Sequence, residues 1–164
     1  MEPEPTTAAR AATPPAASEP LARRSAEHVV LLVLVSLALG VLALFALFVK
    51  PDPRGFGTHE ALGLPPCLPM ELWNVPCPGC GLTTSVALAA HGHVLASLAN
   101  QPFGALLALA VPIAFVWAWV LHLRGRDLRA ELGRLPAGRV AAGVVALASV
   151  AWIYKLALVR GWLG

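Results

Sequence analysis

Three cysteines, Cys67, Cys77 and Cys80, are the residues in this sequence best suited to chemistry. Cys77 and Cys80 stand in a C-x-x-C spacing within the run PCPGCGLT at 76–83. Cysteines at this spacing can exchange electrons as a dithiol or supply half of the ligands of a zinc ion. Three cysteines are too few for a disulfide scaffold, and an odd number leaves at least one thiol without an internal partner. The sequence therefore concentrates its chemistry in one short segment.

Three interpretations of this segment are open. In the first, Cys77 and Cys80 form a redox dithiol at the start of a helix, whose positive end lowers the pKa of a cysteine. Cys67 then acts as their partner thiol. An extracytoplasmic position would allow such disulfide chemistry, although the sequence has no thioredoxin-like βαβ pattern to present the pair.

In the second interpretation, Cys67, Cys77 and Cys80 hold a zinc ion together with His91 or His93. The two histidines are two residues apart and would face different sides of one helix unless the chain breaks between them. A complete second half-site with short ligand spacing is missing from the sequence.

In the third interpretation the segment is structural. Its prolines and glycines make a rigid corner that begins a short helix, which Thr83 or Thr84 caps. The cysteines then pack as small apolar residues, or Cys67 forms a stapling disulfide with one of the other two. Under this interpretation the chain is a non-catalytic membrane scaffold or partner subunit.

The composition indicates a membrane protein. Of the 164 residues, 57% are hydrophobic and 13% are charged, and the mean hydropathy is +0.70. A soluble domain carries about 25% charged residues. The net charge of +3 arises from basic residues beside apolar runs, so no nucleic-acid partner is expected. The sequence has no glycine-rich phosphate loop, no G-x-S-x-G or H-E-x-x-H motif and no carboxylate pair near a span, so no cofactor-binding residues are assigned, and zinc is the one cofactor that the sequence suggests.

Three apolar runs are long enough to cross a bilayer. They cover residues 29–49, 103–123 and 140–159, and at about 1.5 Å per residue each spans the roughly 30 Å hydrocarbon core. Asn100 is expected to cap the second of these helices, and Lys155 is expected to extend outward from the end of the third.

The rest of the chain divides into a tail and a membrane domain. Residues 1–26 are rich in Pro, Ala, Thr and Glu and are predicted to be a disordered cytoplasmic tail, followed by a single membrane domain at 27–164. Residues 82–99 are barely long enough to span and carry His91-Gly92-His93 in their middle, so we predict two short helices, re-entrant or interfacial, hinged at Gly92. The predicted fold is an all-α integral membrane protein with three transmembrane helices and this helical pair.

Arginines set the predicted topology. Five of them lie in residues 124–139, and Arg10, Arg23 and Arg24 precede the first apolar run. Positively charged loops stay in the cytoplasm, so two crossings must separate these segments. The N-terminus is then cytoplasmic, and the C-terminus and the cysteines are extracytoplasmic, in the cell (inner) membrane.

The expected partners are the lipid bilayer and another membrane-spanning surface. Small residues four apart on a helix let a neighbouring helix approach closely. The second span carries such a stripe, expected to bind a membrane-protein partner or a second copy of the chain: Ala110, Ala114 and Ala118.

The cysteine segment resembles a bacterial membrane family known as domain of unknown function 2752. The family's pattern is C-P-x-C-G-[LM]-T followed by Arg, and this chain has CPGCGLT at 77–83, with Cys67 ten residues upstream. The similarity runs from about Arg54 to Arg160. No activity is established for the family, so the resemblance implies a membrane architecture and not a reaction.

The chain differs from the family's pattern at two places. Thr84 stands where the family usually has Arg, and Gln101 is inserted between Asn100 and Pro102, where the family has Asn-Pro. A function that depends on that arginine is therefore not implied for this chain. The sequence predicts an extracytoplasmic thiol site with a redox or metal-holding role or, in the alternative, a scaffold.

Overall fold

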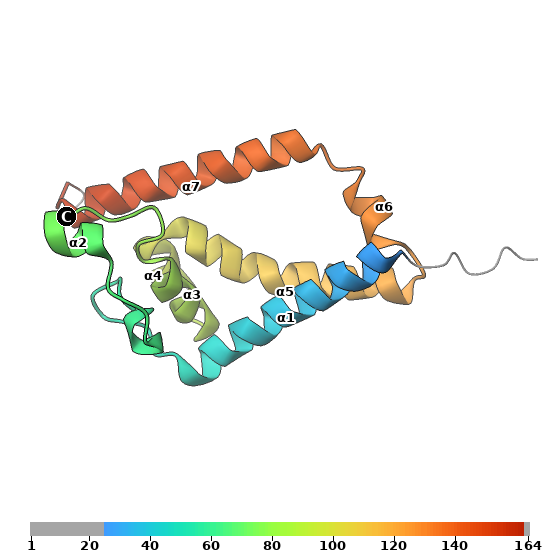
Figure 1. Cartoon of the computed structure of the whole chain (residues 1–164), viewed down its shortest axis with the longest axis horizontal. Coiled ribbons are helices and arrows are strands. Elements are labelled where there is room, and N and C mark those ends of the chain that lie inside the picture. The colour runs from blue at the N-terminus through green and yellow to red at the C-terminus, as the bar shows by residue number, and fades with distance from the viewer. Residues whose placement is uncertain (1–24, 163–164) are drawn as a thin grey trace, which may run out of the picture.

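The protein is all-helical in the computed structural model, which describes residues 25–162 (Figure 1). Its elements are α1 (Ala26–Phe48), η1 (Glu60–Leu62), α2 (Leu68–Trp73), α3 (Leu82–Ala90), α4 (Val94–Asn100), α5 (Pro102–Leu123), α6 (Leu128–Leu132) and α7 (Ala137–Val159). Three of these helices, α1, α5 and α7, are long and apolar enough to cross a membrane. The predicted all-α fold, with three helices long and apolar enough to span a membrane, is confirmed. Residues 1–24 of the predicted tail lie outside the described residues, and α1 begins at Ala26.

α1 and α5 lie side by side near α6 and diverge toward their other ends (Figure 1). A small apolar cluster joins them to α6: Ala118, Leu121 and Leu128, packed against Leu31, Leu32 and Val35. The indole N–H of Trp119 adds a hydrogen bond of 3.2 Å to Ser36 Oγ. Of the predicted alanine stripe, Ala118 is therefore used within the chain, while Ala110 and Ala114 are exposed. Binding of a partner by the stripe stays a prediction, and it now concerns Ala110 and Ala114 alone.

A buried histidine joins α1 to α5 and α6. His28 is completely buried, and its Nδ1 accepts a hydrogen bond of 3.0 Å from the Leu128 amide. The neutral ring therefore carries its proton on Nε2, which donates to Nδ1 of His122, 3.0 Å away. The two rings are stacked, with their centroids 5.4 Å apart. These contacts hold the start of α1 against the end of α5.

The arginine-rich loop is held at the same end of the molecule. Asp127 caps α6 by accepting hydrogen bonds from the amides of Arg129 and Ala130, and it also accepts from the Ser25 amide at 3.2 Å and the Ser25 hydroxyl at 3.0 Å. Arg129 pairs with Glu27 at 2.7 Å. The start of α1 and the loop between α5 and α7 therefore lie on one side of the molecule, which is the arrangement that the charge-based topology needs.

Acid is expected to weaken this junction. The Ser25 amide, assisted by the Ser25 hydroxyl and two α6 amides and opposed by burial, holds the pKa of Asp127 below its usual value. Such a carboxylate stabilises the fold above its unfolded pKa of about 3.9, and this contribution is lost as the pH falls through the folded pKa. The hydrogen-exchange protection factor of the Ser25 amide should therefore drop below about pH 4.

An Asp127→Asn variant should show low protection of the Ser25 amide already at neutral pH, with no further drop in acid. Asp52→Asn, which changes a carboxylate elsewhere in the chain, serves as the control and should behave as the wild type does at Ser25. A wild-type protection factor that stays constant through the acid range would contradict the role assigned to Asp127.

α3 and α4 form the predicted pair of short helices. The chain breaks between them at Gly92, whose φ of +82° favours glycine. The hydroxyls of Ser85 and Ser97 each donate to the backbone carbonyl of the other residue, at 3.1 and 2.6 Å. The pair lies between the diverging ends of α1 and α5 (Figure 1).

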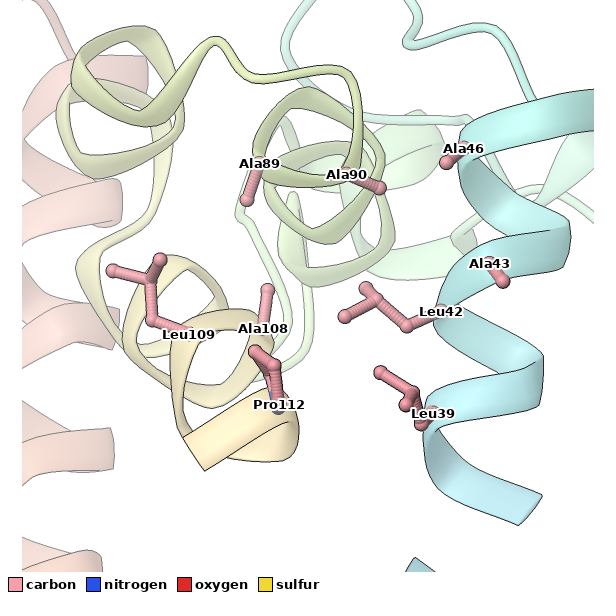
Figure 2. Close-up of a pocket in the computed structure, with 9 residues that line it drawn as sticks. All are labelled: Leu39, Leu42, Ala43, Ala46, Ala89, Ala90, Ala108, Leu109 and Pro112. Carbon is pink, nitrogen blue, oxygen red and sulfur yellow. The ribbon is translucent and has the colours of Figure 1, made fainter. Parts of the chain in front are cut away.

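An apolar hollow of about 280 Å³ lies where α1, α3 and α5 meet (Figure 2). Figure 2 shows its lining, which consists wholly of leucine, alanine and proline side chains. The hollow exists because all three helices contribute alanines, whose side chains are too small to fill the space between them. Because the lining offers no polar or ionisable side chain, the hollow is not a place for acid–base or thiol chemistry.

α7 meets the rest of the molecule near its C-terminal end. Its buried residues are one alanine and Lys155. The Trp152 indole N–H donates to the Pro76 carbonyl at 2.9 Å, and the Tyr154 hydroxyl donates to the Ala99 carbonyl at 2.8 Å. Figure 1 shows α7 diverging from α5 toward α6. Contacts with the cysteine segment and the end of α4 therefore position the third span.

Candidate thiol site

Residues 76–83 form a tight corner ahead of α3. The Cys80 amide donates to the Cys77 carbonyl at 2.9 Å, and the Leu82 amide donates to the Gly79 carbonyl at 3.1 Å. Gly81 then takes a φ of +83° and is the N-cap residue of α3. These overlapping turns bring Cys77 and Cys80 close to each other at the helix start, as the C-x-x-C spacing predicts.

Cys67 joins this pair from another element. It is the N-cap residue of α2, and its thiol interacts with the thiols of both Cys77 and Cys80. All three cysteines are free thiols. Cys80 is buried, and Cys67 and Cys77 are half-buried. We call these three residues the thiol cluster.

The three thiols differ in acidity. Burial opposes ionisation of Cys67, but the Met70 amide and then the thiols of Cys77 and Cys80 outweigh it, and the pKa of Cys67 is lowered. Burial and then the neighbouring Cys67 raise the pKa of Cys77. Burial, followed by the charges of Cys67 and Cys77, raises the pKa of Cys80 to about 11, with Lys155 acting in the opposite direction. Cys67 is therefore the first of the three to become a thiolate, and the prediction that the helix start lowers the pKa of Cys77 or Cys80 is wrong, because burial and the neighbouring thiols raise both.

Lys155 lies against the cysteine corner from α7. Its side chain donates hydrogen bonds to the Gly55 carbonyl at 3.0 Å and to Asn100 Oδ1 at 2.8 Å, and the residue is 5% exposed. The prediction that Lys155 extends outward is wrong. The signal present in the sequence was the position of Lys155 inside the apolar run, because a charged residue within a span is costly and usually finds a partner in the protein.

Asn100 connects Lys155 to the start of α3. Its Nδ2 donates to the Gly81 carbonyl at 3.1 Å and to Ser85 Oγ at 2.9 Å, while its Oδ1 accepts from Lys155. Asn100 is the last residue of α4 and does not cap α5. The predicted Asn cap is wrong, because the inserted Gln101 takes that role and accepts from the Gly104 amide at 2.6 Å.

Thr84 is buried in a second polar contact of the site. Its hydroxyl oxygen lies 2.8 Å from that of Thr58, which also accepts a hydrogen bond from the Asp52 amide. Neither Thr83 nor Thr84 caps α3, since Gly81 is the N-cap residue and the helix start has no side-chain cap. The predicted threonine cap is wrong. Thr84 instead ties the loop after α1 to the first turn of α3.

A hollow of about 350 Å³ opens between α2 and the last turns of α7, and none of the three cysteines lines it. Its lining includes Met70, Asn74, Lys155 and Arg54. Met70 lies one helical turn from Cys67, whose carbonyl accepts from the Met70 amide at 3.0 Å. The hollow therefore reaches the first turn of α2, which follows Cys67, but not the thiols themselves.

The structure does not bring His91 and His93 to the cysteines. Both histidines follow α3, whose nine residues extend about 13 Å beyond the cysteine corner, and both are exposed. His91 Nδ1 lies 2.8 Å from the Ala87 carbonyl oxygen. Within residues 25–162, no group of three or more His, Cys, Asp or Glu side chains is arranged to hold a metal ion. The zinc site stays a prediction that this arrangement does not support.

Residues 67–123 match the model of a family described as "Protein of unknown function (DUF2752)". The predicted resemblance is confirmed, over a shorter stretch than the expected 54–160. The match begins at Cys67 and ends with α5, so it contains the thiol cluster, Asn100 and Gln101 but not α1 or α7. No curated protein and no solved structure matches the chain.

Proposed function

Since residues 67–123 match a family without a known function, we propose a function from the chemistry of the site. The chain carries out thiol–disulfide exchange, through the thiol cluster, with a partner on the extracytoplasmic face of the cell membrane. The observation that carries this proposal is the meeting of three free thiols of unequal acidity, one of which stands at the start of a separate helix, α2. A thiolate, and not a thiol, is the nucleophile in such exchange.

The orientation rests on charge. Ser25 and Glu27 at the start of α1 contact Asp127 and Arg129 of the arginine-rich loop, so both segments share one side. Loops rich in Arg and Lys stay cytoplasmic. If the N-terminus and this loop are cytoplasmic, the opposite ends of α1, α5 and α7 are extracytoplasmic. The thiol cluster lies at those ends, on the side of the membrane where disulfides form and persist.

The exchange takes two steps. The Cys67 thiolate attacks one sulfur of the partner's disulfide, which forms a mixed disulfide and releases the partner's other sulfur as a thiolate. Cys77, which contacts Cys67 through its thiol, then loses its proton to water and attacks Cys67 Sγ. The Cys67–Cys77 disulfide forms, and the partner leaves with both sulfurs reduced. The reverse sequence oxidises a partner dithiol, and in either direction two electrons are transferred.

Two other functions compete with this proposal. A metal-holding role needs a fourth ligand for three cysteines, and the histidines expected to supply it are exposed beyond the far end of α3. A scaffold role needs no thiol at all. Proline, glycine and Trp152 already hold the corner in place, so cysteines with unequal acidity are not required for its shape.

Thiol labelling in intact cells tests the proposal. A membrane-impermeant maleimide should label the reduced wild type at Cys67, and treatment with dipyridyl disulfide should remove two of the three thiols from labelling. A reducing agent should restore both. A periplasmic reporter fused after Gly164 should be active, since the C-terminus is then outside.

The controls separate the competing functions. The Cys67→Ser/Cys77→Ser/Cys80→Ser variant gives the background of the labelling. If the purified protein contains stoichiometric zinc, and the thiols become reactive as this zinc is released, the function is metal holding and not thiol–disulfide exchange. If the thiols do not react with dipyridyl disulfide and the protein holds no metal, the scaffold function is the one that remains. A fusion active only in the cytoplasm would refute the extracytoplasmic site.

A further inference from the structure

Lys155 is a buried cation in an apolar helix, and the two exchange steps above do not use it. The residue is 5% exposed, and two of the three N–H groups of its ammonium donate hydrogen bonds to carbonyl oxygens. A charged side chain is expensive to bury in such a segment and usually marks a functional site. No carboxylate is paired with Lys155 among the hydrogen bonds and ion pairs of residues 25–162.

The backbone next to Cys80 is shaped to receive this cation. A Cβ atom at Gly81 would lie 3.1 Å from Lys155 Nζ, 3.0 Å from its Cε and 2.9 Å from the Gly55 carbonyl oxygen. Only a residue without a side chain allows all three to pack there. Asn100 fixes the position from the other side, since it donates to the Gly81 carbonyl and accepts from Lys155. The ammonium group is therefore held at the residue that follows Cys80.

We propose that Lys155 is a positioning residue that makes Cys80 the third member of a thiol relay. Its ammonium group stabilises the Cys80 thiolate while that thiolate attacks Cys77 Sγ in a Cys67–Cys77 disulfide. The disulfide then moves to Cys77–Cys80, and Cys67 is released as a thiolate for the next partner. This inference rests on the proposed exchange function and adds a step to it.

The relay step balances without a further reactant. The Cys80 thiol gives its proton to water, and the resulting thiolate forms a bond to Cys77 Sγ. The Cys67–Cys77 bond breaks, and its electron pair stays on Cys67 Sγ. One disulfide and one thiolate are present before and after the attack, so no oxidant or reductant is consumed.

The charges around Cys80 explain why the step follows oxidation. In the reduced cluster, Cys67 and Cys77 oppose ionisation of Cys80, while Lys155 favours it. A Cys67–Cys77 disulfide removes both opposing charges and leaves the positive charge of Lys155 next to Cys80. Loss of like charges and retention of an opposite charge both lower a thiol pKa. Cys80 thus becomes a better nucleophile once its target disulfide exists.

The position of the disulfide tests the relay. Purified protein receives one equivalent of dipyridyl disulfide, is quenched in acid, and its disulfide is mapped by mass spectrometry. In the wild type the disulfide should end on Cys77–Cys80. In Lys155→Met, which keeps the length of the side chain without its charge, it should stay on Cys67–Cys77, and its rearrangement should slow by at least about tenfold, the factor of one pKa unit.

Tyr154→Phe is the matched control. It removes a hydrogen bond from the same end of α7 but leaves the cation in place, so its disulfide should move as in the wild type. Lys155→Met protein with the wild-type disulfide distribution and rate would overturn the relay. Wild-type protein that forms no internal disulfide would instead overturn the exchange function on which the relay rests.

A second measurement keeps Lys155 and so does not depend on the folding of the methionine variant. In Cys67→Ser/Cys77→Ser, the pH at which Cys80 is half-maximally alkylated should fall by about one unit or more below the wild-type value, since the two opposing charges are gone and the cation is kept. An unchanged midpoint would mean that the charges around Cys80 do not control it, which would refute the relay.

Discussion

Replacing Cys67 with serine is expected to slow the reaction of the chain with dipyridyl disulfide by at least about tenfold at neutral pH. Cys67 has a lowered pKa, below 9.0, whereas burial and its neighbours raise the pKa of Cys80 to about 11. Each pKa unit that separates two thiols is a factor of about ten in thiolate fraction, and the greater nucleophilicity of the more basic thiolate offsets about half of that exponent. Stopped-flow release of pyridine thione measures the rate.

The pH profile gives the sharper form of this prediction. The wild-type rate should rise with pH and level off below pH 9.0, as Cys67 ionises. Cys67→Ser should lack this inflection. Cys77→Ser is the matched control, because it keeps the first attack but leaves the mixed disulfide on Cys67 unresolved by Cys77. A Cys67→Ser variant with the wild-type rate and profile would show that another thiol makes the first attack.

Substituting Gly81 by alanine is expected to lower the free energy of unfolding by about 2–4 kcal/mol. Gly81 has a φ of +83°, a conformation that costs an L-residue about 1–2 kcal/mol. Its new Cβ would also lie 2.9 Å from the Gly55 carbonyl oxygen and 3.0 Å from Lys155 Cε. One of the two must move, and either movement disturbs a hydrogen bond of the Lys155 ammonium group.

Gly63→Ala separates the two contributions to this cost. Gly63 has a nearly equal φ of +79°, and a Cβ there would meet no heavy atom within 4 Å. This variant should cost about 1 kcal/mol, the conformational part alone, and the reduced entropy of its unfolded chain offsets some of that. Reversible unfolding in mixed micelles measures both variants. Equal costs at the two positions would contradict the close packing of Lys155 against Gly81.

The two sets of experiments address different parts of the site. The Cys67 variants test which sulfur begins the exchange, and the Gly81 variants test whether the cation from α7 is seated against the cysteine corner. A chain that needs Cys67 for its reaction but tolerates alanine at Gly81 would retain the exchange function without the relay. The thiol chemistry and the contribution of α7 can therefore be judged independently.

Local sequence determined the spans, the hinge and the cysteine corner. An apolar run as long as the hydrocarbon core has few alternatives to a spanning helix, and α1, α5 and α7 follow the predicted runs closely. Gly92 ends α3 because its backbone tolerates a positive φ. Cys77 and Cys80 meet because a turn of four residues brings them together, which proline and glycine within the same run are sufficient to cause.

Only the tertiary structure decided which residues join that corner. Lys155 is 100 residues from Gly55 and 55 residues from Asn100 in the sequence, yet it binds both. No period or local preference relates such positions. The same contacts took Asn100 from the expected cap of α5 and gave that role to Gln101, while the length of α3 kept His91 away from the thiols. A buried polar group must find its partner wherever packing places one, and that placement depends on the whole set of helices.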